Sequence, residues 1–247
     1  MKEKNPKKAL ALTLFISSVC FVMTAAFSIA DIILNPRTSE FCRFAFRMYP
    51  MEKAYAFAKI AVAAYSLPLL ALSVGLALCA WSLLFGRKSA AGHKTASVSA
   101  VILAAEAIAF CVSYAVYLIA GVFVNLAVKN FSGVAVSFAV SLVLFAFSVM
   151  WIAYASSFRR FPMSLVKLAS GEDSGEVSAF LCVYPFIVAA LLAFLGFDGG
   201  TLMMNLASLS ACAAMICLGV CAVFYNNGIK RKNKKAKEVY LLDYNKK

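Results

Sequence analysis

The feature that most constrains this chain is a long apolar run, residues 95–128, whose only acidic or basic side chain is Glu106. The hydrocarbon core of a bilayer is about 30 Å thick, and about 20 apolar residues in a helix cross it. This run is therefore long enough to cross a membrane. A charge near the middle of such a span costs about 2.5–3.5 kcal/mol, so Glu106 requires a partner, water or a bound proton.

Composition indicates that the whole chain belongs in a bilayer. Of the 247 residues, 63% are hydrophobic and 14% are charged, whereas soluble domains are about 25% charged. We predict an all-α fold, a polytopic transmembrane helical bundle of six spans that forms a single integral membrane domain. The predicted spans are residues 9–34, 54–85, 95–128, 132–157, 177–197 and 201–225, and a basic tail covers 226–247.

The first span follows a basic segment and has some features of a signal peptide, including a passable cleavage site at Ser28-Ile29-Ala30. The apolar region of a signal peptide is about 7–15 residues long, and this run is clearly longer. We therefore expect an uncleaved first span.

The distribution of positive charge predicts the orientation. An even number of spans places both ends of the chain on one side, and 18 of the 24 Lys and Arg residues lie on that side. The positive-inside rule then predicts that both termini are cytoplasmic, in a plasma membrane of the prokaryotic type. The basic tail is a candidate for contact with anionic lipid, although such tails commonly only anchor the topology.

Three other polar residues share the helical face of Glu106. Ser99, Ser113 and Tyr117 are 7, 7 and 11 residues away from it, which places them within about 20° of Glu106 around a helix. We expect this stripe to face other helices and to form a candidate ligand-binding or ion-binding site. Ser148 on the fourth span lies at a similar depth and is the first candidate partner of Glu106. The alternative is a protonated glutamate, hydrogen-bonded to a serine, that only stabilises packing.

A second polar stripe follows the first span along its length. Its members fall within about 60° of one another, which predicts packing inside a bundle. They are Thr13, Ser17, Thr24, Ser28 and Asp31. Lys59, near the start of the second span, should lie at the same membrane surface as Asp31, and we predict an ion pair between spans one and two. The alternative is that Lys59 extends to the interface alone.

The sequence offers little for catalysis. Its only histidine, His93, lies in a basic connection, and without a second histidine a His-based metal site is hard to assemble. Seven of the eight cysteines lie in apolar runs, where cysteine behaves as a small hydrophobe. We predict no enzyme activity, no metal site and no cofactor. Topology accounts for the positive charge, so no nucleic-acid partner is expected.

Two classes of function remain. The first is a small transporter or permease-like subunit with a polar pathway between helices around Glu106. The chain has no ATP-binding motif, so such a subunit needs an ion gradient or a partner membrane or ATPase subunit. The second class is a non-transporting accessory, immunity or assembly protein whose polar stripes only pack helices. A hydrated cavity at Glu106 favours the first class, and a dry, packed interior favours the second.

Overall fold

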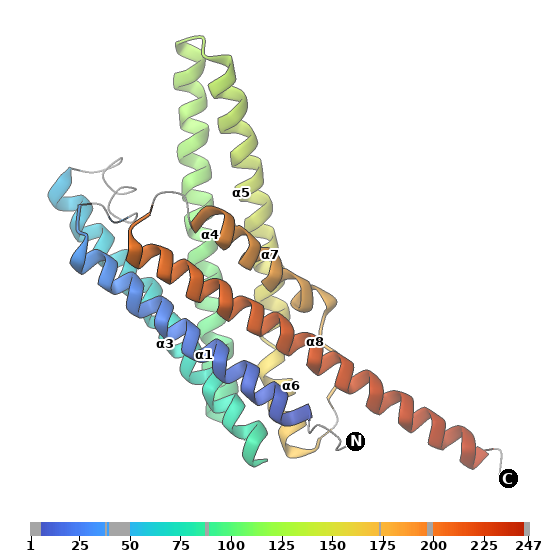
Figure 1. The fold of residues 1–247 in the computed structure, drawn as a ribbon. Helices are drawn as coiled ribbons and strands as arrows, with labels where there is room; N and C mark the ends of the chain where they lie inside the picture. Colours follow the sequence, from blue (N-terminus) through green and yellow to red (C-terminus); the bar gives the residue numbers. More distant parts are fainter. Residues whose placement is uncertain are drawn as a thin grey trace.

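The computed structural model describes residues 6–37, 39, 50–86, 89–172, 174–196 and 200–244. Every regular element in this part of the chain is an α-helix, which confirms the predicted all-α bundle (Figure 1). In chain order the helices are α1 (Pro6–Leu34), α3 (Met51–Phe85), α4 (Ala90–Ala127), α5 (Phe131–Phe158), α6 (Phe161–Ser170), α7 (Ala179–Gly196) and α8 (Leu202–Tyr244).

Five helical segments of the described residues are long and apolar enough to cross a membrane, so the chain is a multi-pass membrane protein. They are Lys7–Leu34, Lys53–Phe85, Ala90–Ala127, Phe131–Ser170 and Leu202–Asn233. α7 has 18 residues and is about 27 Å long, slightly less than the ~30 Å hydrocarbon core. The count of six crossings therefore stays a prediction. The start of α1 and the end of α8 lie at the same end of the molecule, as an even number of crossings requires (Figure 1).

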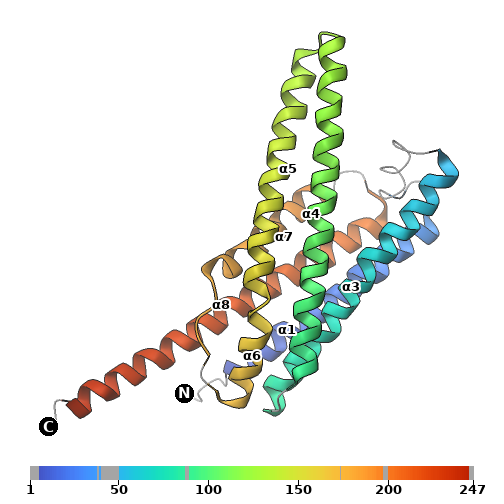
Figure 2. The same ribbon diagram turned by 180° about the vertical axis from the view of Figure 1, so that it is seen from behind.

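α1 is the centre of the arrangement. It packs against α3 on one side and against α8 on the other, and α7 lies along α8. α4 packs on α3, and α5 pairs with α4. The far halves of α4 and α5 project away from the other helices, as both ribbon views show (Figures 1 and 2). We call residues 110–145, which form this projection, the outer hairpin.

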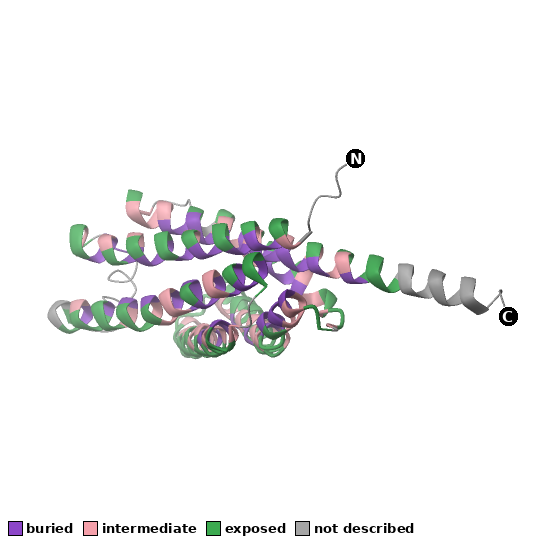
Figure 3. Ribbon diagram, turned by 90° about the horizontal axis from the view of Figure 1, so that it is seen from below, coloured by how far each residue is buried: buried purple, intermediate pink, exposed green. Residues whose placement is uncertain are grey.

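Burial follows this division (Figure 3). In α1, α3 and α8 the most apolar stretch is 44%, 56% and 56% buried within the chain, whereas in α4 it is 6%. The core therefore lies between α1, α3 and α8, together with the inner ends of the remaining helices. Most side chains of the outer hairpin are exposed or only partly buried within the chain.

Small residues allow α3 and α4 to approach closely. A Cβ atom added to Gly75 would lie 2.5 Å from the backbone nitrogen of Ala96, and one added to Gly92 would lie 2.8 Å from the Cβ of Leu78. Glycine and alanine at such contacts bring helix backbones together, which increases van der Waals contact in a medium where lipid offers no hydrophobic driving force. The same contacts set an antiparallel register in which residues 75 and 96 lie opposite each other.

A series of aromatic rings in contact, mostly tilted or edge-to-face, joins α7, α5, α6 and α8 at the end of the molecule opposite the tip of the outer hairpin. Successive ring centroids are 5.0–6.1 Å apart, a range in which each pair contributes about 0.5–1.5 kcal/mol beyond the burial of its area. In order of contact, the rings belong to Phe180, Tyr184, Tyr154, Phe158, Phe161 and Tyr225. This series fixes the short α6 against the longer helices.

The sequence predicts that the last helix ends at residue 225, but α8 continues to Tyr244. Asn226 has a polar side chain typical of a turn, but here it is held by a tertiary contact. Its side chain accepts a hydrogen bond from the Val177 amide at 2.9 Å and donates one to the Val177 carbonyl at 3.0 Å. The following Lys, Ala, Glu and Leu residues favour helix. Much of the predicted tail therefore extends α8, and its side chains beyond residue 233 lie outside the described residues.

We predict that Gly75→Ala destabilises the protein by about 1–3 kcal/mol, because the added methyl group overlaps the α4 backbone and forces the helices apart. Thermal unfolding of the purified protein in detergent, followed with a thiol-reactive dye that reports exposure of buried Cys79 and Cys221, measures the change. Gly121→Ala on α4 is the matched control, since nothing lies within 4 Å of its added Cβ. An equal melting temperature for the two variants would contradict this packing.

Candidate functional site

Glu106 lies on the side of α4 that approaches α3. Tyr65 on α3 lies close enough to its carboxyl group for an electrostatic interaction, as expected from the register set at Gly75. The Oε2 atom of Glu106 is buried and has no hydrogen-bond partner in the structure. The side chain as a whole is only half-buried. Glu106 is therefore partly enclosed by its own chain, without a group that neutralises or hydrogen-bonds its buried oxygen.

The stripe predicted around Glu106 is divided by the fold. Ser99 is buried, at 4% exposure, where α4 packs within the bundle. Ser113 and Tyr117 lie on the outer hairpin and are exposed, and the Tyr117 ring stacks on Tyr114 with centroids 6.1 Å apart. Helical periodicity places these residues on one face correctly, but it does not show that the neighbouring helices cover only the inner half of that face.

Ser148 is not the partner of Glu106. It is buried on α5, donates a hydrogen bond to the Leu144 carbonyl at 3.0 Å, and lies beside the Cys111 thiol of α4. Cys111 is five residues beyond Glu106, which is about 140° around the helix. α5 therefore packs against a different face of α4 from the face that carries Glu106, although Ser148 lies on the helix that the prediction named.

The predicted ion pair between Asp31 and Lys59 is not formed. Asp31 is fully buried, and its Oδ1 accepts hydrogen bonds from the Thr201 hydroxyl and from the Asn35 side chain. Lys59 is exposed, and its Nζ lies 4.1 Å from the centre of the Tyr55 ring. The two residues are on helices that do pack together, but α1 turns Asp31 toward α8 and not toward α3.

The stripe on α1 packs inside the bundle, as predicted, and most of its members bond to α8. Ser17 donates to the Ala214 carbonyl at 3.0 Å, and the hydroxyls of Thr24 and Ser210 are 2.9 Å apart. The contact between Asp31 and Thr201 extends this row of hydrogen bonds to the end of α1 and the start of α8. Polar groups bonded in this way between helices act as packing contacts in a membrane.

α1 is joined to α3 by a reciprocal pair of hydrogen bonds. The Ser18 hydroxyl donates to the Ser73 carbonyl at 2.8 Å, and the Ser73 hydroxyl donates to the Ser18 carbonyl at 3.2 Å. Neither serine was a candidate site residue in the sequence analysis. Two isolated serines on different spans carry no pattern that pairs them, so only the tertiary structure reveals the contact.

A polar depression of about 320 Å³ lies near α6, between the end of α5 and the start of α7. Serine hydroxyls from residues 156, 157, 164 and 178 line it together with Arg160 and Glu176. The sequence analysis did not identify this group, because its members come from two helices, α5 and α6, and from the connections that follow them.

No protein-family model, no curated protein sequence and no solved structure matches this chain. Its function is therefore inferred from the arrangement of its own residues.

We predict that Ser17→Ala lowers stability by about 0.6 kcal/mol, because it removes a hydrogen bond between α1 and α8 in a medium without competing water. The change is measured as the shift in thermal unfolding in detergent. Ser82→Ala is the control, since Ser82 is also fully buried but donates only to Leu78 of its own helix, at 2.9 Å. Ser82→Ala should have the smaller effect, and the reverse order would argue against the hydroxyl contacts as the link between helices.

Proposed function

We propose that this multi-pass protein is a non-transporting assembly subunit of the plasma membrane, with both termini cytoplasmic, that binds a second transmembrane chain along the outer hairpin. The observation that carries the proposal is the contrast between the two parts of the fold. The hydroxyls of α1 find partners within the chain, whereas the Glu106 Oε2 atom, at the base of the outer hairpin, finds none.

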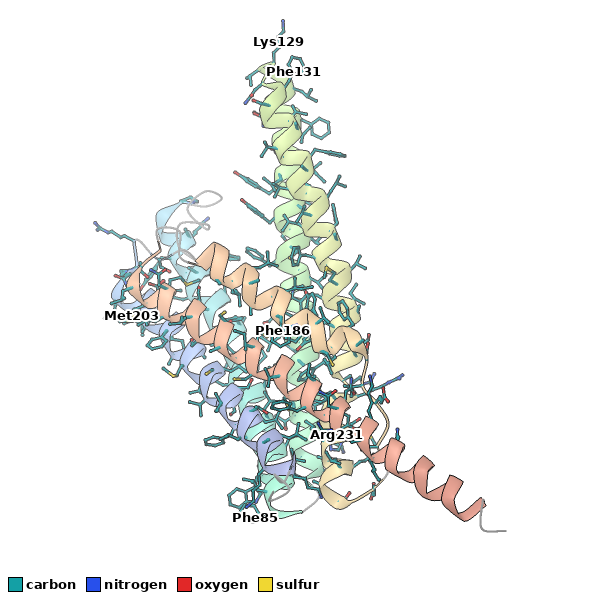
Figure 4. The ribbon with its side chains drawn as sticks, turned by 45° about the vertical axis from the view of Figure 1, so that its right-hand side comes forward. Phe85, Lys129, Phe131, Phe186, Met203 and Arg231 are labelled. Carbon is teal, nitrogen blue, oxygen red and sulfur yellow. The ribbon has the colours of Figure 1, made fainter. Side chains whose placement is uncertain are left out.

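The surface of the outer hairpin supports this proposal. Figure 4 marks its tip with Lys129 and Phe131, whose side chains point away from the molecule. Large apolar side chains cover the hairpin on several sides; those more than half exposed include Phe110, Val116, Phe123, Val136, Phe138 and Val143. Lipid satisfies these side chains, but it does not satisfy a carboxyl group. Acidic residues within membranes are commonly paired with another group or line a functional path. A neighbouring chain with a hydrogen-bond donor or a positive charge at the depth of Glu106 supplies that pair.

Transport is the second candidate function, and the same buried oxygen favours it. In a transporter or permease-like subunit, Glu106 exchanges a proton or binds a cation, and water must reach it from one side of the membrane. The bonds between α1, α3 and α8 favour the assembly role, because they use the stripe of α1 for packing and leave it unavailable as a pathway.

Photo-crosslinking in the native membrane tests the assembly role. A photoreactive residue at Val116 on the outer hairpin should form an adduct with another membrane-spanning chain, identified by mass spectrometry. The control position is Val74 on α3, which has nearly the same exposure, 56% against 57% for Val116. We expect a several-fold higher adduct yield at position 116. Glu106→Leu should reduce that yield, and Ser82→Ala, which alters a buried residue of α3 away from the outer hairpin, should leave it unchanged.

Equal yields at the two positions, or adducts with lipid alone at position 116, would exclude the assembly role. The transport alternative is tested separately by substituting Cys at Ser113 and Ser148 in a chain without native cysteines. Labelling of the buried position 148 by a membrane-impermeant, water-soluble thiol reagent would indicate a hydrated path and favour transport.

A further inference from the structure

Asp31 lies where the end of α1 contacts the start of α8, and the proposed assembly role does not involve it. Asp31 is 0% exposed. Its Oδ1 accepts hydrogen bonds from the Thr201 hydroxyl and, at 3.3 Å, from the Asn35 side chain. Its Oδ2 is buried and has no hydrogen-bond partner among the described residues. One oxygen of the carboxyl group therefore has two donors while the other has none.

Two further buried oxygens at this end also lack partners, the Oδ1 of Asn205 and the Oγ of Ser39. Asn205 lies one helical turn after Thr201, to whose carbonyl its amide donates at 3.0 Å. Its Oδ1 would lie 3.1 Å from a Cβ atom at Gly200, so the side chain turns back toward the start of α8. Ser39 lies one turn after Asn35. Met203 marks this end of α8 in Figure 4.

The unpartnered oxygens require an electropositive group. An ionised carboxylate oxygen and an amide oxygen only accept hydrogen bonds, so the Oδ2 of Asp31 and the Oδ1 of Asn205 each require a donor or a cation. A buried charge is also costly unless it is paired. Neither oxygen of Asp31 contacts a Lys or Arg among the described residues, since Lys59 lies over Tyr55 and Arg37 is exposed.

We propose that Asp31, Thr201 and Asn205 bind a monovalent alkali cation of the sodium type. Carboxylate, hydroxyl and amide oxygens are hard ligands, which suit alkali and alkaline-earth ions better than transition metals. A single carboxylate balances a single positive charge, whereas a divalent ion leaves a buried excess charge. Three or more His, Cys, Asp and Glu side chains do not gather anywhere in the described part of the chain, so no competing site for a softer metal is evident there.

The ion has a structural consequence. It joins the end of α1 to the start of α8, which are separated by 170 positions in the sequence at the Asp31–Thr201 contact. An ion that binds only the folded state stabilises that state in proportion to the logarithm of its concentration above the dissociation constant. Sodium should therefore stabilise the protein by an amount that grows with the logarithm of its concentration.

The test measures thermal unfolding of the purified full-length chain in detergent while NaCl replaces choline chloride at constant ionic strength. The melting temperature of the wild type should rise with the logarithm of the sodium concentration once that concentration exceeds the half-saturating value for binding, and it should stay constant if the site does not exist. Asp31→Asn, which keeps the oxygen that accepts from Thr201, should abolish the sodium response. Asn205→Ala should raise the half-saturating sodium concentration about tenfold, the effect of losing about 1.4 kcal/mol of binding.

Two controls isolate the site. Ser28→Ala alters a buried residue on the same face of α1, at 2% exposure, and should keep the sodium response. Glu106→Gln should also keep it, so this test does not depend on the outer hairpin. Binding of radioactive sodium to the same variants provides a second readout if Asp31→Asn does not fold.

A melting temperature that is equal in sodium and choline but depends on pH in the wild type would identify a bound proton at Asp31 and overturn the cation site. A sodium response that persists in both Asp31→Asn and Asn205→Ala would also overturn it.

Discussion

The structure depends on hydrogen bonds made between helices where no water competes for them. α1 is joined to α8 through Ser17 and Thr24, and to α3 through the reciprocal Ser18 and Ser73 pair. Because lipid is as apolar as the helix surfaces, burial of apolar area does not by itself select which helices associate. The hydroxyls of α1 make that selection, and small residues such as Gly75 then allow close backbone contact.

The molecule has two parts that differ in how their polar and apolar groups are satisfied. The helices around α1 satisfy most of their polar groups internally. The outer hairpin instead exposes aromatic and aliphatic side chains such as Phe123 and Val136, with Glu106 at its base. A chain built in this way is suited to remain folded by itself while offering one projecting pair of helices to a neighbour.

Asp31 and Glu106 each have one buried carboxyl oxygen without a hydrogen-bond partner among the described residues, but their surroundings differ. Asp31 lies where the end of α1 meets the start of α8, with the Thr201 hydroxyl on one of its oxygens, so a small ion is sufficient to pair with its other oxygen. Glu106 is only half-buried, where α4 leaves the bundle, so a side chain of a neighbouring chain can approach it. Their surroundings therefore lead us to propose an ion for the first acid and a protein partner for the second.

Hydropathy and helical periodicity are local properties, and they were enough to predict the all-helical membrane fold, the approximate limits of most helices, and the burial of the α1 stripe. Only the tertiary structure decided which helix each polar face meets. It turned Asp31 toward α8 and away from Lys59, placed Ser148 beside Cys111, and extended α8 past Asn226. Periodicity specifies the direction of a side chain around its own axis, but the partner it meets depends on how whole helices pack, which no local pattern records.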